Sequence, residues 1–513
     1  GSVMQRVVHS ILGHWLRHPP TDYIIEPVYA VLNEPGYRYA RQFISRMLDI
    51  WPIWCEDEVV EPMAGDIFVG LDLQPAIIPQ QQALLQEWRR MGVTIRFVIY
   101  DLLPAIAPEY FFPGARPHHH AWLETISHFD GALCISQSVA NEYREWLDHY
   151  GPERITPLEI DWFHLGCDLG TQRVGTGDLP PGSEETLDKL RSAPSFLSVA
   201  TVEPRKGFRQ TLDAMEMLWA KGLDLNFVIV GKPGWMMDNF IARLQSHAEL
   251  GKRLFWLQGI SDEYLHAVYS ACHYMIAASQ GEGFGLPLIE AARYDLPVLA
   301  RDIPVFREVA GNAAIYFANS RDPAILAKAI ENLLRSKKGI SKRPQMKWLT
   351  WAQSAKTLLA CVTRENSPYL QWMPDNVHRF WGSDHRLSSQ VGIPEGTQIR
   401  TSAKSGFLAF GPYMSLDAGC WTIRAEGEAL CLDGSETLDI VSHGASKVHF
   451  SASLVRKGKA WVIEGDYVME ERAEGIEIRL WVSEASDLSL AGLCLTPRVA
   501  DPKVDLQLSE LAT

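Results

Sequence analysis

The stretch SQGEGFGLPLIE, residues 279–290, organises the expected fold of this chain. It follows an apolar run at 274–278 of the kind found in buried parallel strands. Pro287 suits the first turn of a helix over 287–293, because proline there fixes φ and gives up an N–H that has no partner at that position. The stretch therefore predicts a strand, a glycine-rich loop and a helix in direct succession.

The loop has the chemistry of an anion site. Its glycines let the backbone approach a ligand, and the first N–H groups of the following helix have no partners within that helix. These amides and the helix dipole favour a phosphate. Glu282 and Glu290 flank the amides, and carboxylates are acceptors suited to sugar hydroxyls. The loop thus predicts a site for a sugar joined to a diphosphate, and the alternative is an ordinary glycine turn.

Length and composition bound the class of protein. A chain of 513 residues should hold two to four domains. The apolar share of 47% and the charged share of 21% are ordinary for soluble proteins. We find no apolar run of about 18 residues and no signal peptide, so no membrane-spanning helix is expected. The eight cysteines are scattered without a C-x-x-C pair, which indicates buried thiols in a reducing compartment rather than disulfides or zinc.

The net charge of −14 is unevenly distributed along the chain. Residues 191–365 carry 22 Lys and Arg against 16 Asp and Glu, whereas residues 1–190 carry 13 against 26. The basic segment holds the expected diphosphate site, as electrostatic complementarity requires. The acidic first segment argues against binding of nucleic acid, and against docking of that half on anionic lipid.

Four segments with different patterns follow one another. Residues 1–170 and 191–366 each alternate strand and helix patterns, which predicts two α/β domains with parallel sheets and a cleft at the carboxyl ends of their strands. Residues 171–190 begin rich in Gly, Pro and Thr and are the expected linker. Short alternating runs over 375–500 predict an antiparallel β-sandwich. Tryptophans in that part would pack in its core, or stack on sugar rings if exposed.

Polar residues follow several expected strands of the second domain. Arg205 and Lys206 come shortly after the strand at 195–200, where they could neutralise a diphosphate; the alternative is a solvated surface pair. Gly231, Lys232 and Ile260 follow two further strands and could border a nucleotide base. Plain strand-to-helix turns would have the same sequences, so this second interpretation stays open.

Two features of the first domain bear on chemistry. Asp101 ends an apolar strand at 93–100 and could contact an acceptor hydroxyl or steady positive charge on a sugar; it could also cap the following turn. The run 118–120 holds three consecutive histidines, which do not converge on one ion, so we expect a polar loop and no metal site. Ser138 is the expected cap of a helix ending near residue 149.

The motifs around residues 195–310 resemble the signature of family 4 retaining glycosyltransferases. That family has a glycine loop, Phe-Gly and two glutamates with seven residues between them, as Glu282 and Glu290 have here, and a Lys-Gly pair as at Lys206-Gly207. Residues 4–365 are similar to bacterial enzymes of the polysaccharide and O-antigen type. Tyr100 stands where a related motif has histidine, and the sandwich resembles modules attached to some cell-surface polysaccharide enzymes.

The resemblance implies the GT-B fold and a retaining, metal-independent enzyme without a cofactor. Such an enzyme moves a hexose from a nucleotide diphosphate sugar to a growing cell-surface glycan. Mannose from GDP-mannose is the first expectation and rhamnose the second, with UDP-hexoses open. No nucleophilic carboxylate is evident, so the resemblance favours front-face attack assisted by the departing phosphate.

The resemblance also implies roles for particular residues. Glu282 is expected to face the hexose, Glu290 to accept hydrogen bonds from both ribose hydroxyls, and Asp101 to act near the acceptor. The expected catalytic residues are Glu282, Asp101, Arg205 and Lys206. The expected donor-binding residues are Arg205, Lys206, Gly231, Lys232, Ile260, Gly283, Phe284, Gly285, Leu286 and Glu290.

Alternative functions remain at this point. One is a sugar phosphorylase or sucrose-type synthase on the same fold. Another is a glycan-binding protein with inactive transferase domains, which Tyr100 and the lack of a strand before the helix at 4–17 favour. The expected partners are a nucleotide sugar, a glycan or lipid-linked oligosaccharide and other polysaccharide-assembly enzymes, but no nucleic acid. The expected location is the cytoplasm, with the cytoplasmic face of the inner membrane as a second option.

Overall fold

The computed structural model describes residues 3–50, 57–152, 154, 156–168, 179–335, 345–374 and 377–498. The chain forms two compact units. The first comprises residues 1–105, 110–143 and 157–372, and the second comprises 106–109, 144–156 and 373–513. Within the described residues, no helix is both long and apolar enough to cross a lipid bilayer.

The first unit contains two parallel sheets, of which the earlier in the chain has five strands. These strands lie in the order β13 (Leu370–Trp372), β6 (Leu158–Trp162), β5 (Gly131–Cys134), β4 (Thr94–Ile99) and β3 (Ile67–Gly70). β3 to β6 pair in parallel, and β13 joins β6 antiparallel at the edge. β4 and β5 are almost wholly buried, and β4 includes the buried Arg96, which is paired with Glu159 at 2.6 Å.

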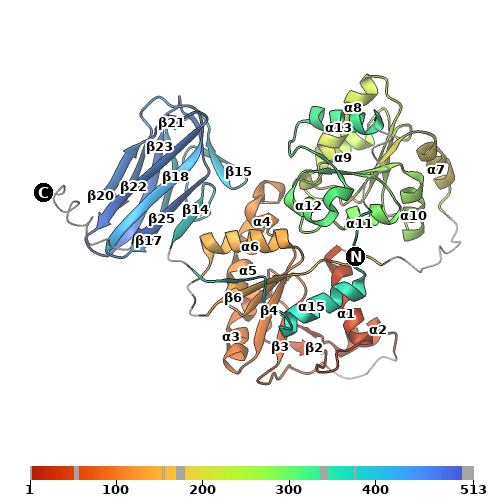
Figure 1. Cartoon of the computed structure of the whole chain (residues 1–513), viewed down its shortest axis with the longest axis horizontal. Helices are drawn as coiled ribbons and strands as arrows, with labels where there is room; N and C mark the ends of the chain where they lie inside the picture. The colour runs from red at the N-terminus through yellow and green to blue at the C-terminus, as the bar shows by residue number, and fades with distance from the viewer. Residues whose placement is uncertain are drawn as a thin grey trace. The chain divides into compact units, whose positions relative to one another are not determined.

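Helices surround this first sheet (Figure 1). They are α1 (Val3–Arg17), α2 (Arg41–Met47), η1 (Ile78–Gln81), α3 (Gln82–Arg90), α4 (Leu103–Ile106), η2 (Pro108–Tyr110), α5 (Ala115–Ser127), α6 (Gln137–Tyr150) and α15 (Trp351–Thr363), beside a ribbon of β1 (Val28–Tyr29) and β2 (Arg38–Tyr39). α15 packs against α1 although some 340 residues separate them, and the Trp15 indole donates to the carbonyl of Ala355 at 3.0 Å.

The second sheet is wholly parallel and has helices on both faces (Figure 1). Its strands lie in the order β12 (Ile315–Phe317), β11 (Val298–Arg301), β10 (Tyr274–Ala277), β7 (Ser195–Val199), β8 (Asn226–Val230) and β9 (Leu254–Leu257). The helices are α7 (Ser183–Ser192), η3 (Pro204–Lys206), α8 (Phe208–Ala220), α9 (Asp238–Gln245), α10 (Asp262–Ala271), α11 (Leu286–Arg293), α12 (Pro304–Ala310), η4 (Gly311–Ala313) and α13 (Pro323–Arg335).

The second unit is an antiparallel β-sandwich. One sheet has the order β14 (His378–Trp381), β25 (Gly492–Arg498), β18 (Gly419–Cys431), β24 (Asp487–Leu490), β16 (Gln398–Thr401) and β15 (Gly392–Glu395), with β22 (Ala460–Met469) on β18 and β21 (Arg456–Lys457) on β22. The other has the order β17 (Gly406–Leu416), β23 (Ala473–Val482), β19 (Thr437–Ser442) and β20 (Lys447–Ser453). Trp381, Trp421 and Trp461 are buried, so these three pack rather than stack on sugars.

The end of α6 belongs to the sandwich unit. The guanidinium of Arg386 lies between the rings of Tyr150 and Phe380, 4.5 and 4.4 Å from their centroids. The ring of His149 packs against that of Trp381 at 4.4 Å. These aromatic and cation–π contacts attach residues 144–156 to β14 and the turn that follows it.

The predicted fold class is confirmed, and some local predictions need correction. Residues 118–120 are not a polar loop, because α5 begins at Ala115 and buries His119 and His120. The cap of α6 is Ser136, whose hydroxyl accepts the N–H of Val139 at 3.2 Å; Ser138 instead binds Glu308. Both predictions were wrong because they rested on the polarity of the residues and left out the tertiary contacts that these residues make in the folded chain.

Two segments differ from the predicted domain ranges. The second half of the predicted linker 171–190 enters α7, while residues 171–178 lie outside the described part. The range 191–366 includes α15, which packs on α1, β5 and β6 of the first domain. The chain thus returns to the first domain before the sandwich begins, because the apolar face of α15 completes the core there.

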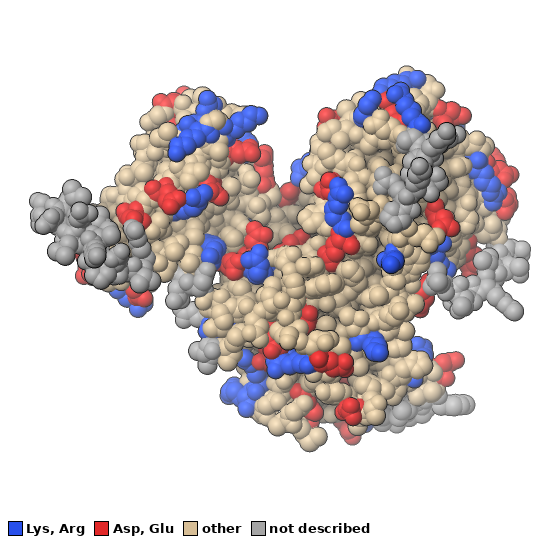
Figure 2. Space-filling model, in the orientation of Figure 1, with Lys and Arg blue, Asp and Glu red and all other residues tan. Residues whose placement is uncertain are grey.

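Acidic and basic side chains are interspersed over the surface in Figure 2. The net positive charge of residues 191–365 therefore does not form a continuous basic surface on that face. The positive charge at the expected site comes from Arg205 and Lys206, which follow β7.

Candidate active site

The glycine loop joins β10 to α11, as predicted. Gly285 precedes the helix with a φ of 99°, a left-handed value that favours glycine. A Cβ at this position would also lie 2.9 Å from the ring of Phe306. Within the described residues, the N–H groups of Phe284 and Gly285 donate no hydrogen bond. They stay available at the start of the helix, as an anion site requires.

The other two loop glycines lie against the first α/β domain. A Cβ on Gly283 would lie 1.9 Å from the carbonyl oxygen of Tyr100, and one on Gly281 would lie 2.6 Å from Leu103. The Ser136 hydroxyl also donates to the Gly283 carbonyl at 2.8 Å. These glycines thus admit the close approach of the first domain's own chain, and a contact of Gly283 with the donor stays a prediction.

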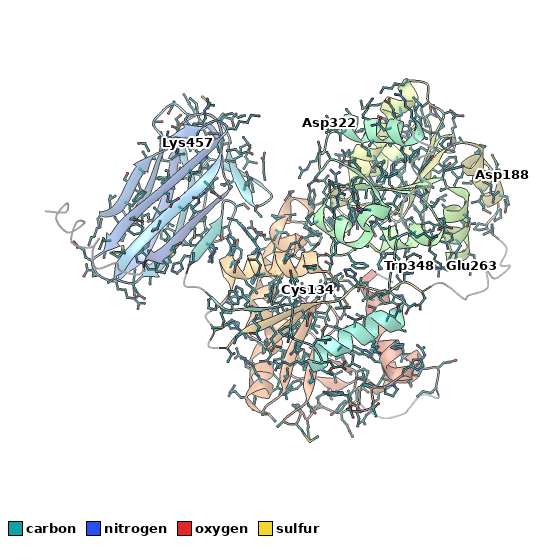
Figure 3. The ribbon with its side chains drawn as sticks, viewed as in Figure 1. Cys134, Asp188, Glu263, Asp322, Trp348 and Lys457 are labelled. Atoms are coloured by element: carbon teal, nitrogen blue, oxygen red, sulfur yellow. The ribbon has the colours of Figure 1, made fainter. Side chains whose placement is uncertain are left out.

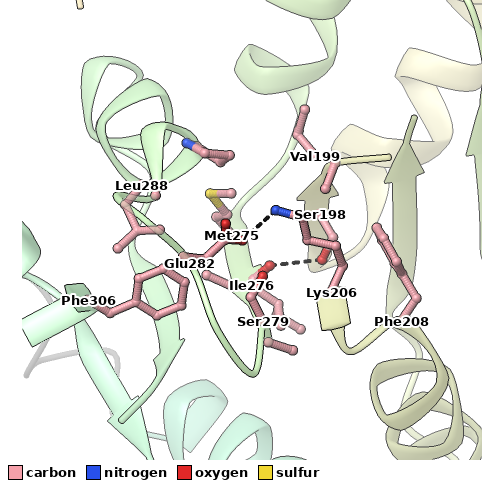
Figure 4. Close-up of a pocket in the computed structure, with 15 residues that line it drawn as sticks. Ser198, Val199, Lys206, Phe208, Met275, Ile276, Ser279, Glu282, Leu288 and Phe306 are labelled. Atoms are coloured by element: carbon pink, nitrogen blue, oxygen red, sulfur yellow. Dashed lines mark hydrogen bonds and ion pairs between the residues drawn. The ribbon is translucent and has the colours of Figure 1, made fainter. Parts of the chain in front are cut away.

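Arg205 and Lys206 lie on η3, directly after β7, and both reach Glu282. Arg205 donates from one terminal nitrogen to the Glu282 carboxylate at 2.8 Å and to the Gly281 carbonyl at 2.9 Å. Lys206 donates to the other Glu282 oxygen at 2.5 Å (Figure 4). The left-handed Gly207 lets η3 approach β10, because a Cβ there would meet the Ala278 carbonyl at 2.3 Å. The structure thus brings three predicted residues into one buried cluster.

The electrostatics of this cluster follow from burial and pairing. Burial opposes ionisation of Glu282, but Lys206 and Arg205 outweigh it and lower the pKa of that carboxyl to about 2. Burial and the neighbouring Arg205 lower the pKa of Lys206 despite the pull of Glu282. Burial alone would lower the pKa of Arg205, yet Glu282, Glu203 and Asp101 raise it. The Nε of Arg205 is buried without a hydrogen-bond partner among the described residues.

Two more carboxylates lie close to these cations. Glu203, which the sequence interpretation missed, forms an ion pair with Arg205 at 2.8 Å, and its side chain is only 4% exposed. Its place two residues before Arg205, at the same strand end, was the available signal. Asp101 accepts the N–H of Leu103 at 3.1 Å, so it caps the following turn, which was the stated alternative. That contact does not test a role in catalysis.

Glu290 has surroundings quite different from those of Glu282. One oxygen accepts a hydrogen bond from Arg6 at 2.7 Å, and the other accepts one from the Tyr269 hydroxyl at 3.1 Å. The Tyr269 ring stacks on that of Tyr294, with centroids 4.8 Å apart. Burial and the Glu290 carboxylate raise the pKa of Tyr269. Arg6 is a second residue that sequence reasoning missed, because α1 meets α11 only in the folded chain.

The predicted base-bordering residues lie at the carboxyl ends of β8 and β9. A Cβ on Gly231 would lie 1.8 Å from the Ala200 carbonyl, and the Lys232 carbonyl accepts the N–H of Val202 at 2.9 Å. Ile260 directly precedes Ser261, which caps α10. They occupy the same sheet edge as η3, and their proposed contact with a base stays a prediction.

Two cavities adjoin the glycine loop. A cavity of about 30 Å³ lies behind the pair of Lys206 and Glu282 and is also lined by Ser198, Met275 and Phe306 (Figure 4). That volume suits one water molecule. A larger cavity of about 240 Å³ is lined by His164, Phe284 and Trp348, of which Figure 3 labels Trp348.

No three His, Cys, Asp or Glu side chains converge as metal ligands within the part of the chain that the structure describes. The cysteines there are free thiols, and Cys134, Cys167 and Cys272 are buried. Metal independence stays a prediction.

Comparisons with known proteins relate the chain to sugar-transferring enzymes. Residues 184–347 match the family described as glycosyl transferases group 1. The serotype-specific mannosyltransferase WbdA of Escherichia coli is 40% identical over 361 residues, 69% of this chain and 44% of that protein. The O-antigen chain mannosyltransferase RfbU of Salmonella typhimurium is 30% identical over 156 residues, 30% of this chain and 43% of that protein.

Among solved structures, Alr3699/HepE of Anabaena in complex with UDP and glucose is similar with a TM-score of 0.41. It is 16% identical, and the match covers 58% of this chain and 75% of that one. The present chain spans less than half the length of the WbdA proteins that it matches. Residues 184–347 are thus similar to group 1 glycosyl transferases, and the chain is similar to bacterial O-antigen mannosyltransferases over less than half of the WbdA length.

Proposed function

We propose that the chain is a retaining mannosyltransferase that acts without a divalent metal or cofactor. It moves mannose from GDP-mannose, or in second place rhamnose from its nucleotide sugar, to a growing cell-surface glycan. The observation that carries this proposal is the pair Arg205 and Lys206 beside the amides of Phe284 and Gly285, which donate to no acceptor in the described part of the chain. Homology to a mannosyltransferase at 40% identity supports the choice of sugar.

The proposed reaction breaks the anomeric C–O bond and leaves a cation-like sugar and a nucleoside diphosphate. Arg205, Lys206 and the two amides stabilise the charge that develops on the leaving group. The buried Nε of Arg205, which has no partner among the described residues, supplies a further donor. The diphosphate competes with Glu282 for both cations, and the released Glu282 carboxylate then accepts hydrogen bonds from hexose hydroxyls.

Retention is proposed to arise by front-face attack. The acceptor hydroxyl approaches on the side of the leaving diphosphate, whose oxygen takes the hydroxyl proton. Asp101 already accepts the Leu103 amide, and Glu203 is paired with Arg205. These contacts support a route in which neither carboxylate forms a covalent bond with the sugar. Asp101 can still orient the acceptor with its second oxygen.

The proposed donor is a nucleotide sugar, and the proposed acceptor is a glycan or a lipid-linked oligosaccharide. A lipid-linked acceptor would bring the enzyme to the cytoplasmic face of the inner membrane, near other enzymes of polysaccharide assembly. We propose no nucleic-acid partner, so nuclease treatment of the purified protein should leave its activity unchanged.

The test is to incubate the purified chain with GDP-mannose, dTDP-rhamnose and UDP-hexoses in EDTA, with mannan oligosaccharides as acceptors. Release of GDP and formation of an α-linked product, seen by NMR, are expected from GDP-mannose. A β-linked product would overturn retention, and activity only with added Mg²⁺ or Mn²⁺ would overturn metal independence. Acceptor binding without release of any nucleoside diphosphate would favour the glycan-binding alternative.

A further inference from the structure

Glu203 is a buried charged group beside the proposed diphosphate site that the proposed mechanism leaves without a role. Its carboxylate lies 2.8 Å from one terminal nitrogen of Arg205. We propose that Glu203 is a positioning residue that holds the guanidinium of Arg205 in the plane needed by the leaving diphosphate. This inference rests on the proposed function and adds to it a residue that acts through Arg205 rather than on the substrate.

The two edges of the Arg205 guanidinium are held differently. One terminal nitrogen forms an ion pair with Oε1 of Glu203, which accepts no hydrogen bond among the described residues, and the other donates to the Gly281 carbonyl and to Glu282. Because the guanidinium is rigid, a fixed negative charge that attracts one edge also favours one direction for the remaining donors. An arriving diphosphate can replace Glu282 at one terminal nitrogen of Arg205 while Glu203 stays beside the other.

The backbone of Glu203 leaves the side chain little freedom. Its carbonyl accepts the Lys206 N–H at 3.2 Å, and Pro204 follows it with a restricted φ. A Cβ on Gly234 would lie 3.2 Å from the Glu203 Cβ, so the loop after β8 packs directly against it. With the Glu203 side chain 4% exposed against 14% for that of Arg205, the carboxylate is the more deeply fixed partner of the pair.

The charge balance explains why such a partner is useful. Asp101, Glu203 and Glu282 all face Arg205, and Lys206 is the second cation. Without Glu203, the guanidinium would be free to turn toward the two remaining carboxylates. Burial, and then Glu282 and Asp101, raise the pKa of Glu203 against the effect of the cations.

The experiment compares Glu203→Ala with Glu203→Gln, which keeps an oxygen acceptor of the same length. The control is Glu216→Ala, which removes a carboxylate paired with Arg243 at 2.7 Å on the surface of the same domain. Turnover and KM for GDP-mannose are measured on each variant after its melting temperature confirms folding. Because small misplacement of a positioned group costs up to about 100-fold, we expect Glu203→Ala to lower kcat about 10- to 100-fold with a smaller change in KM. Glu203→Gln should keep at least about a third of kcat, and the control should match the wild type.

The decisive arm repeats Glu203→Ala in an Arg205→Ala background. If Glu203 acts through Arg205, the double variant turns over as slowly as Arg205→Ala alone, because the two losses are not independent. Losses that multiply, or a Glu203→Gln as slow as Glu203→Ala, would overturn the positioning role while the wild type still transferred sugar. A wild type that released no nucleoside diphosphate from any donor would instead overturn the proposed function itself.

Discussion

Glu308 on α12 holds Ser138 at the start of α6. One oxygen of the Glu308 carboxylate accepts the backbone N–H of Ser138 at 2.8 Å and the Ser138 hydroxyl at 2.6 Å. The other oxygen accepts the N–H of Gln137 and contacts the imidazole of His164, both at 2.7 Å. A side chain from the second α/β domain thus satisfies helix-start donors of the first. Burial opposes the charge of Glu308, but these donors outweigh it and lower the pKa of the carboxyl.

Glu308→Ala should destabilise the protein by about 1–3 kcal/mol, the usual cost of a lost helix cap together with charged hydrogen bonds. Urea unfolding of both proteins measures the difference. Arg307→Ala on the same helix, which loses an exposed pair with Asp302 and a cation–π contact with Tyr316, is the control and should cost less. Equal midpoints for wild type and Glu308→Ala would show that water replaces the carboxylate at no cost.

Glu282 should govern part of the acid sensitivity of the protein. The pKa of its carboxyl is about 2 in the folded chain, against an ordinary value of 4.5, so the unfolded chain binds its proton first as pH falls. The stabilisation is therefore complete above about pH 4.5 and disappears between pH 4.5 and 2. Glu282→Gln should have a flatter loss of stability across that window, as measured by thermal melts at a series of pH values. Parallel curves would place the acid sensitivity elsewhere.

Arg205→Ala and Lys206→Ala should each weaken the transition state by about 2–4 kcal/mol, the usual loss for one preorganised charge-stabilising donor. Values of kcat/KM for GDP-mannose measure the effect. Arg243→Ala, on the surface of α9, is the control and should leave them unchanged. Full activity in both site variants would show that Arg205 and Lys206 have only a structural role.

Glu282 and Glu290 should have separable roles. Glu290 is held by Arg6 and Tyr269 one turn into α11, so it is placed to accept ribose hydroxyls once Arg6 yields. Glu290→Ala should weaken binding of bare GDP by about 1–3 kcal/mol, the cost of a lost charged hydrogen bond. Glu282→Ala should leave GDP affinity nearly intact, or improve it by freeing two cations, while turnover falls. Calorimetry and steady-state rates on both variants decide this, and equal losses of GDP affinity would contradict it.

The sandwich should be dispensable for donor chemistry. The cut belongs after residue 373 rather than near 367, because β13 (Leu370–Trp372) completes the first sheet by pairing with β6. The shortened chain should still hydrolyse or transfer the donor sugar, with altered use of long acceptors. The shortened chain should carry Tyr150→Ser and His149→Ser, because these two aromatic side chains of α6 lose their sandwich partners after the cut and would become exposed. Loss of GDP binding in the shortened chain would show that the sandwich is part of the enzyme.

Local sequence patterns were sufficient for most regular elements. The strand Asn226–Val230 is apolar after its first residue, Leu254–Leu257 is wholly apolar, and the helix at 286–293 follows a glycine and has proline as its second residue. Such patterns depend on neighbours within one or two turns, so the sequence alone displays all that matters to them. The nearness of Arg205, Lys206 and Glu282 also followed, because carboxyl ends of parallel strands share one sheet edge.

The sequence by itself therefore determined the two parallel sheets, the sandwich and the loop that bears the site. Only the tertiary structure decided which charges meet there. Arg6 reaches Glu290 across 284 residues, and Glu308 reaches Ser138 across 170. It also decided that Gly283 faces the Tyr100 carbonyl. These contacts depend on how separately formed elements pack, and a contact between distant segments leaves no periodic trace in either segment.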